Sequence, residues 1–237
     1  MTLRKTRPLR RLLTALAALS ALGTAATIAA QDWNLTVTQT DAGYRIGKPN
    51  APVSLIAFLS YTCPSCGRFA QAADGALALG YVGPGQVTLE NRPMVRDPVD
   101  LTVTMLVDCV DARRHAAAHA TFMERQSGWL ARATAVPQAQ RALWGDAGQS
   151  AERRRSIAST LDFYPMVERF GIDRTGTNRC LSNQKNADAL LAAANANRTR
   201  FGVRGTPSFA IDGVLLEGVH DWSSLRPLID ARIRPAG

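Results

Sequence analysis

Two cysteines lie two residues apart in the sequence Cys63-Pro64-Ser65-Cys66. A pair at this spacing can alternate between a dithiol and a disulfide, or it can supply half of a zinc site. No second Cys-x-x-Cys and no His-x-x-x-His pair flanks it at the spacing of a zinc ribbon. We therefore interpret the pair as a redox centre, with Cys63 as the exposed nucleophile, Cys66 as the shielded resolving thiol, and Pro64 and Ser65 as their neighbours in the site.

The flanking residues place this motif between a strand and a helix. Residues 53–59 are nearly all apolar, which is typical of a strand buried on both faces of a sheet. Pro64 suits the first turn of a helix, where a missing N–H is harmless. The unpaired N–H groups and partial positive charge of a helix N-terminus lower the pKa of a thiol, and the thiolate is its reactive form. The helix itself is predicted by apolar residues at helical spacing, namely Phe69, Ala72, Ala73, Ala76 and Leu77.

A second motif, Gly205-Thr206-Pro207, lies near the other end of the chain. An apolar strand follows it directly, and Asp212-Gly213 between two apolar runs predicts a hairpin. Residues 187–201 and 222–233 carry the apolar spacing of helices. Taken alone, Gly-Thr-Pro is an ordinary turn sequence, but together with the upstream Cys-x-x-Cys it is interpreted as part of the same site.

This order of motifs resembles the thioredoxin superfamily. The segment Gly47-Lys48-Pro49-Asn50-Ala51-Pro52-Val53 resembles the DsbA-like branch of exported thiol:disulfide oxidoreductases, and the similarity covers about residues 44–233. The resemblance implies an α/β thioredoxin fold with an all-helical insertion between the second and third core strands. It also implies that Pro207 is cis and faces the cysteine pair, and that Thr206 binds an extended substrate segment through its backbone.

The middle of the chain fits such an insertion. Residues 87–90 are typical of the second core strand, and Pro207 follows Cys63 by 144 residues, far more than one crossover needs. The segment rich in Ala, Leu and Arg that follows predicts helices over 98–110, 112–126, 138–144, 149–160 and 163–171, with a loop at Gly128-Trp129. We therefore expect a thioredoxin-fold first part over 31–97, a helical insertion domain over 98–178 and a thioredoxin-fold second part over 179–237.

Residues 1–30 are typical of a secretory signal peptide. A basic start up to Arg11 precedes an apolar run over residues 12–22, and small residues lead to Ala29 and Ala30. The run is short for a membrane span, which needs about 20 apolar residues, so an uncleaved anchor is the alternative interpretation. A cleaved signal predicts a mature protein in the periplasm, an oxidising compartment.

The two remaining cysteines, Cys109 and Cys180, flank the predicted insertion. In an oxidising compartment a leftover pair is interpreted as a structural disulfide. The alternative is two buried free thiols that behave as small apolar residues.

The charge of the chain gives no support to a nucleic-acid partner. The formal net charge of +9 includes five basic residues within residues 1–30, and the remaining 207 residues carry 23 basic against 19 acidic side chains. The run Arg153-Arg154-Arg155 is short and lacks interleaved aromatic residues, so we interpret it as a charged helix face. His115 and His119 share one face of a predicted helix and are interpreted as a solvated or interdomain face, not as a metal site.

The resemblance implies disulfide exchange without an organic cofactor. Its substrates would be reduced exported polypeptides, and a DsbB-type membrane quinone reductase would reoxidise the pair. Two departures predict an oxidant milder than the strongest DsbA proteins: Ser65 stands where those carry His, and Ala57 stands where many carry a buried Glu. A periplasmic disulfide reductase or isomerase is therefore the alternative.

The remaining alternatives come from the chemistry of the pair and the length of the chain. Residues 31–62 are too few for the N-terminal dimerisation domain of DsbC-type isomerases, which favours a monomeric oxidase. A copper-handling protein would carry a Met-rich or His-rich segment, and the sequence has none. A peptide-binding module without catalysis would not need the intact Cys63 and Cys66 pair.

Overall fold

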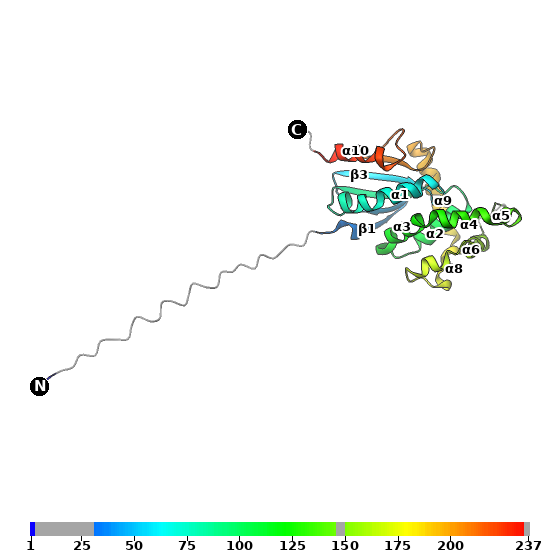
Figure 1. Cartoon of the computed structure of the whole chain (residues 1–237), viewed down its shortest axis with the longest axis horizontal. Coiled ribbons are helices and arrows are strands. Elements are labelled where there is room, and N and C mark those ends of the chain that lie inside the picture. The colour runs from blue at the N-terminus through cyan, green and yellow to red at the C-terminus, as the bar shows by residue number, and fades with distance from the viewer. Residues whose placement is uncertain (3–30, 146–149, 235–237) are drawn as a thin grey trace. The chain divides into compact units, whose positions relative to one another are not determined.

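The computed structural model describes residues 1–2, 31–145 and 150–234 (Figure 1). Gln31–Gly237 forms one unit of the chain and Met1–Ala30 another. The predicted signal peptide therefore lies outside the described residues, apart from Met1 and Thr2. In the described ranges no helix is both long enough and apolar enough to cross a membrane.

A six-stranded sheet with the order β1-β2-β4-β3-β5-β6 forms the centre of the fold. The central strand β3 runs parallel to β4 and antiparallel to β5. Six of the seven residues of β3 are buried, which confirms the predicted strand covered on both faces. The strands are β1 (Val37–Thr40), β2 (Gly43–Ile46), β3 (Val53–Leu59), β4 (Val87–Pro93), β5 (Ser208–Ile211) and β6 (Val214–Leu215).

The predicted hairpin is present between β5 and β6. Ile211 pairs with Val214, so Asp212 and Gly213 form a two-residue turn. Both have positive φ, 51° and 83°, as a type I′ turn requires.

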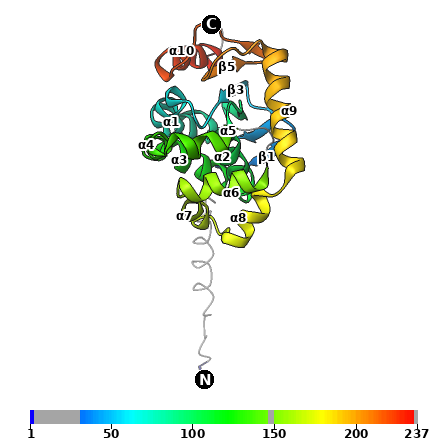
Figure 2. The same cartoon turned by 90° about the vertical axis from the view of Figure 1, so that its right-hand side faces the viewer.

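Alternate side chains of β3 enter two hydrophobic clusters on opposite faces of the sheet. Leu55 packs in the larger cluster, together with the buried face of α1 (Pro64–Leu77). Phe58 packs on the other side against Phe201, the last residue of α9 (Gln184–Phe201). In Figure 2, α9 runs along the opposite side of the strands from α1. The cysteine motif thus begins a helix that is anchored on the central strand.

A helical insertion separates β4 from β5, as predicted. Its helices continue from the carboxyl end of β4 and return to the sheet through α9 (Figure 1). The helical segments are α2 (Pro98–Asp108), η3 (Ala112–Arg114), α3 (His115–Glu124), α4 (Gln126–Ala135), α5 (Gln138–Gly145), α6 (Ala151–Thr160), α7 (Tyr164–Glu168) and α8 (Arg174–Leu181). Outside the insertion lie η1 (Trp33–Leu35), η2 (Ala78–Val82) and α10 (Trp222–Ile233).

The predicted loop at Gly128-Trp129 is wrong, because both residues lie within α4. Trp129 is fully buried, and its indole N–H donates to the Phe122 carbonyl at 3.0 Å. Its ring also packs edge-on against Phe163. The burial of this large side chain in the insertion outweighs the weak helix propensity of glycine.

The predicted charged face at residues 153–155 is also partly wrong. Arg154 is fully buried in α6, although its neighbours are half-buried. Its Nε donates to the Leu181 carbonyl at 2.7 Å, and one Nη donates to Gln184 Oε1 at 3.1 Å. Arg154 therefore joins α6 to the end of α8 instead of facing solvent.

Cys109 and Cys180 form a disulfide in the structure, with their Cα atoms 6.1 Å apart. Cys109 follows the last residue of α2, and Cys180 lies in α8. The bridge joins the two ends of the insertion and closes a loop with a sequence separation of 71 residues.

We expect the removal of this bridge to lower the free energy of unfolding by about 4 kcal/mol. Without the bridge, the unfolded chain gains the conformational entropy of an open loop of this length. Cys109→Ala and Cys180→Ala should be combined in a Cys63→Ser/Cys66→Ser background, so that only one disulfide changes. Urea unfolding of the two proteins gives the difference. Equal midpoints and slopes would show that the bridge adds no stability.

Candidate active site

Cys63 and Cys66 lie at the start of α1, as the sequence predicts. Cys63 is the N-cap residue and Pro64 the first residue of the helix. The Cys63 carbonyl accepts from the backbone N–H groups of Cys66 at 2.9 Å and Gly67 at 3.3 Å. Cys63 is 6% exposed and Cys66 0% exposed. Cys63 is therefore the more accessible thiol, but it is largely covered, which differs from the exposed position expected.

The loop that covers Cys63 contains Thr206 and Pro207. The Cys63 thiol lies 3.1 Å from the Thr206 carbonyl oxygen, to which it donates. The peptide bond between Thr206 and Pro207 is cis, and His220 Nδ1 donates to the Pro207 carbonyl at 2.8 Å. The structure thus brings together the two predicted motifs, which lie 143 residues apart at this contact.

The pKa values of the two thiols are shifted in opposite directions. The hydrogen bond from the Cys66 side chain is the largest cause of the lowered pKa of Cys63, which is about 4. Burial acts against it, whereas the Thr206 side chain and the backbone N–H groups of Cys66 and Ser65 lower the pKa further. Burial raises the pKa of Cys66 well above its usual value, and the hydrogen bond with Cys63 adds to that effect. At neutral pH the reduced pair therefore consists of a Cys63 thiolate and a Cys66 thiol.

The two residues that depart from the family pattern, Ser65 and Ala57, lie in different parts of the structure. The Ser65 hydroxyl accepts from an Arg68 Nη at 2.8 Å and makes no hydrogen bond to a cysteine sulfur. Ala57 is buried in β3, opposite Phe209 of β5. The strand that leads to Cys63 consequently brings no carboxyl group at this position.

Gln126 is a site residue that the sequence did not indicate. It is buried at the start of α4, and its Nε2 donates to the carbonyls of Tyr61 at 2.7 Å and Cys63 at 2.9 Å. A Cβ atom on Gly67 would overlap Gln126 Oε1, so a larger residue there would displace the Gln126 amide. The insertion thereby holds the first turn of the active-site helix.

Asp100 is a second residue that the sequence did not indicate. It is fully buried in the first turn of α2 and bonds to the Ser60–Thr62 segment that leads to Cys63. An aspartate near a helix N-terminus is common for reasons of helix stability alone, so its type and position give no sign of a contact with the active site.

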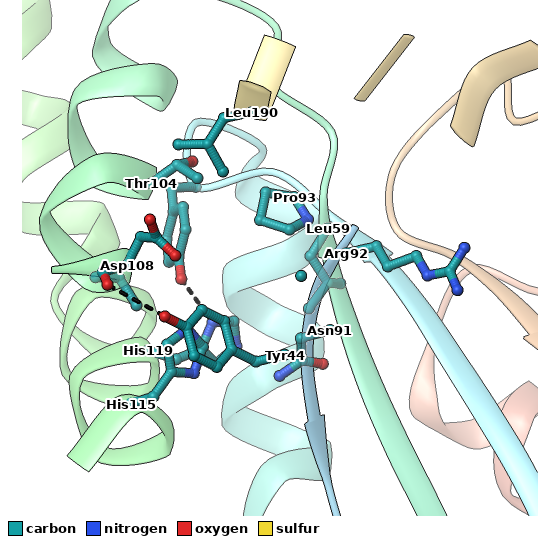
Figure 3. A pocket seen from close by; sticks show the side chains of 13 residues that line it. Tyr44, Leu59, Asn91, Arg92, Pro93, Thr104, Asp108, His115, His119 and Leu190 are labelled. Carbon is teal, nitrogen blue, oxygen red and sulfur yellow. Dashed lines mark hydrogen bonds between the residues drawn. The ribbon is translucent and has the colours of Figure 1, made fainter. Parts of the chain in front are cut away.

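His115 and His119 line a small enclosed cavity of about 20 Å³ between the sheet and the insertion (Figure 3). Both are 5% exposed, so the predicted solvated face is wrong, whereas their position between sheet and insertion agrees with the interdomain alternative. Tyr61 Oη and His119 Nδ1 share a hydrogen bond of 2.8 Å, and Tyr44 stacks on His115 with centroids 3.5 Å apart. Burial lowers the pKa of His115 to about 3 and that of His119 to about 4, so both are neutral at pH 7.

Residues 31–145 and 150–234 contain no candidate metal site. In these ranges no three His, Cys, Asp or Glu side chains are placed to hold one ion.

Comparison with known proteins agrees with this architecture. A family model described as Thioredoxin matches residues 39–231. Two curated proteins named "Putative protein-disulfide oxidoreductase" are similar: one from Rickettsia bellii (23% identical over 189 residues, 79% of this chain and 63% of that protein) and one from Rickettsia typhi (24% over 173 residues, 73% and 55%). The chain thus spans less than two thirds of the length of these curated relatives.

Solved structures are similar over most of the chain. The crystal structure of a protein-disulfide isomerase from Novosphingobium aromaticivorans is 42% identical, with a TM-score of 0.77 and coverage of 80% of this chain and 96% of that one. The α-DsbA1 protein of Wolbachia pipientis is 16% identical, with a TM-score of 0.63 and coverage of 80% and 89%, and it shares the fold. Together with the position of the cysteine pair, these findings show that the chain belongs to the thioredoxin superfamily, and its fold, with the helical insertion, is like that of DsbA proteins.

Proposed function

We propose that this protein is an exported thiol:disulfide oxidoreductase that introduces disulfides into reduced polypeptides. The observation that carries the proposal is the placement of the two thiols: Cys63 is the N-cap of α1 beside the Thr206–Pro207 loop, and Cys66 is fully buried behind it. This placement lowers the pKa of Cys63 to about 4 and raises that of Cys66. A stable thiolate favours the reduced pair, and a favoured reduced pair makes the disulfide form oxidising. This supports an oxidase over a reductase.

The reaction begins with the Cys63–Cys66 disulfide. A substrate thiolate attacks Cys63 Sγ, a mixed disulfide forms, and Cys66 leaves as a thiolate that takes up a proton. A second substrate thiolate then attacks the substrate sulfur of the mixed disulfide, and Cys63 leaves as a thiolate. Two electrons pass from the two substrate thiols to the cysteine pair. Because burial raises the pKa of Cys66, protonation makes its departure hard to reverse.

The surroundings of Cys63 support a polypeptide substrate. The backbone of Thr206 lies beside the sulfur, where an extended segment can pair with it. A groove of about 390 Å³ adjoins Thr62 and is lined on its apolar side by Val99, Leu130 and Trp144. Reduced exported polypeptides, periplasmic location and reoxidation by a DsbB-type quinone reductase belong to the same proposal, as does a monomeric state.

Isomerisation or reduction is the second candidate. It is favoured by the 42% identical protein from Novosphingobium, which is described as a protein-disulfide isomerase. A reductase needs a pair with a more negative potential, so the reduction potential of Cys63–Cys66 distinguishes an oxidase from a reductase, whereas an isomerase is recognised by its repair of a scrambled substrate.

We expect a reduction potential nearer to the value of about −120 mV typical of a strong oxidant than to the value of about −270 mV of thioredoxin. Equilibration with glutathione buffers, followed by alkylation and mass analysis of Cys63 and Cys66, measures it. The protein should also oxidise a synthetic peptide with two cysteines at stoichiometric amounts. A potential near that of thioredoxin would replace the oxidase by a reductase, and rapid repair of a scrambled ribonuclease without net oxidation of the peptide would replace it by an isomerase.

A further inference from the structure

A carboxyl group of the insertion lies behind the segment Ser60–Thr62, here called the active-site turn. Asp100 is 0% exposed, and its oxygens accept from Ser60 Oγ at 2.6 Å, from the Tyr61 N–H at 2.8 Å and from the Arg96 N–H at 3.1 Å. A buried carboxyl with three donors is held in one place. Its position is therefore fixed relative to the turn.

The same turn contacts both cysteines. The Ser60 N–H donates to Cys66 Sγ at 3.5 Å, and the Ser60 carbonyl accepts from the Cys63 N–H at 3.2 Å. Ser60 is thus the one residue between the Asp100 carboxyl and the resolving sulfur along this path. A change in the charge of Asp100 can therefore affect Cys66 through its contact with Ser60.

Hydroxyl groups continue this path toward the rim of the site. Thr62 Oγ1 lies 3.3 Å from Ser60 Oγ and donates to Asp97 Oδ2 at 2.6 Å. Arg96 donates to the Thr62 carbonyl at 2.8 Å and so covers the turn from outside. The Asp100 carboxyl is therefore connected to the rim of the site by polar groups of the turn.

We propose that Asp100 is a positioning residue for the redox pair, and this rests on the proposed disulfide exchange. Its carboxylate orients the Ser60 N–H toward Cys66 Sγ, and its negative charge opposes the thiolate of the reduced pair. Ionised Asp100 then favours the disulfide form, and protonated Asp100 favours the reduced form. The balance between the two forms depends on pH through this one group.

The pKa of Asp100 determines the pH at which the redox balance should change. Burial raises its pKa to about 6, against the hydrogen bond from Ser60, which lowers it, while the nearby Asp97 raises it further. Other charged or titratable groups also lie around the turn. Arg96 precedes α2, and Cys63 and Cys66 lie at the start of α1. His119 of α3 bonds to Tyr61, and Arg198 of α9 donates to the Val95 carbonyl.

Asp100→Asn tests the charge with little change of shape. We expect the variant to have a lower Cys63 pKa, measured by thiolate absorbance at 240 nm. At pH 8 its equilibrium with glutathione should shift toward the reduced form by about two- to threefold, because a negative charge that opposes the thiolate is removed. At pH 5, where wild-type Asp100 is protonated, the difference should nearly vanish. An identical pH profile in both proteins would overturn the proposal.

Ser60→Ala is the second variant, and it decides the matter if Asp100→Asn fails to fold. It keeps the carboxyl but removes a donor that favours its ionised form, so the step in the pH profile should move to higher pH. An unmoved step would contradict the path through Ser60. Asp173→Asn is the matched control, because Asp173 is the N-cap of α8 and should leave the profile unchanged. Absence of any exchange by the wild-type protein would instead refute the proposed function.

Discussion

Cys63→Ser should abolish disulfide exchange completely, to the rate of the buffer alone. The structure leaves no substitute nucleophile in the described site, because Cys66 is 0% exposed and its pKa is raised by burial. A thiol that holds its proton at neutral pH attacks disulfides slowly. Reduction of insulin and oxidation of a dithiol peptide, both followed at pH 7, measure the loss. Activity that survived in Cys63→Ser would favour a peptide-binding role for the fold or a different nucleophile.

Cys66→Ser is the matched variant, and it should behave in the opposite way. Its Cys63 has no intramolecular partner to resolve a mixed disulfide. With glutathione disulfide the variant should accumulate the Cys63 adduct, whereas Cys63→Ser should accumulate little adduct at Cys66. Mass spectrometry of the intact proteins distinguishes the two. Equal adduct formation would contradict the assignment of Cys63 as the attacking thiol.

The parts of the fold that depend on neighbours in the sequence were predicted correctly. β3 follows from an unbroken apolar run, and the β5–β6 turn follows from Asp212-Gly213. The β1–β2 hairpin was not predicted, because its strands have only four residues and β1 has no fully buried residue. Helix α4 was missed because Gly128 suggests a loop, while the burial of Trp129 that stabilises the helix exists only in the folded insertion.

The same distinction applies to the site. Cys63 and Thr206 could be named because each belongs to a short motif, and the structure places them 3.1 Å apart. Gln126 and Asp100 bond to backbone groups of Tyr61 in the active-site turn from 65 and 39 residues away. A side chain that bonds to a distant carbonyl or N–H group leaves no periodic pattern in the sequence, and only the packing of the insertion reveals it.

The reduced protein should become more stable relative to the oxidised one as the pH rises from about 4 toward about 9. The folded-state pKa of Cys63 is about 4 against an ordinary value of 9.0, so in this window the unfolded chain binds a proton that the folded chain does not. The unfolding equilibrium of the reduced form should therefore change by up to about tenfold per pH unit. Below about pH 4 the thiol is protonated in both states, and this contribution is lost.

The comparison of the two redox forms isolates Cys63 together with groups that respond to its charge, such as Asp100. In the oxidised form the sulfur is bridged and does not titrate, whereas groups that titrate alike in both forms, among them His115 and His119, cancel in the difference. Urea unfolding of both forms at several pH values between 4 and 8 gives that difference, and the entropic effect of the short Cys63–Cys66 loop adds only a constant. A difference independent of pH would mean that Cys63 is not a stabilised thiolate. The oxidase would then lose its physical basis, because a pair without a stabilised thiolate has no reason to prefer the reduced form.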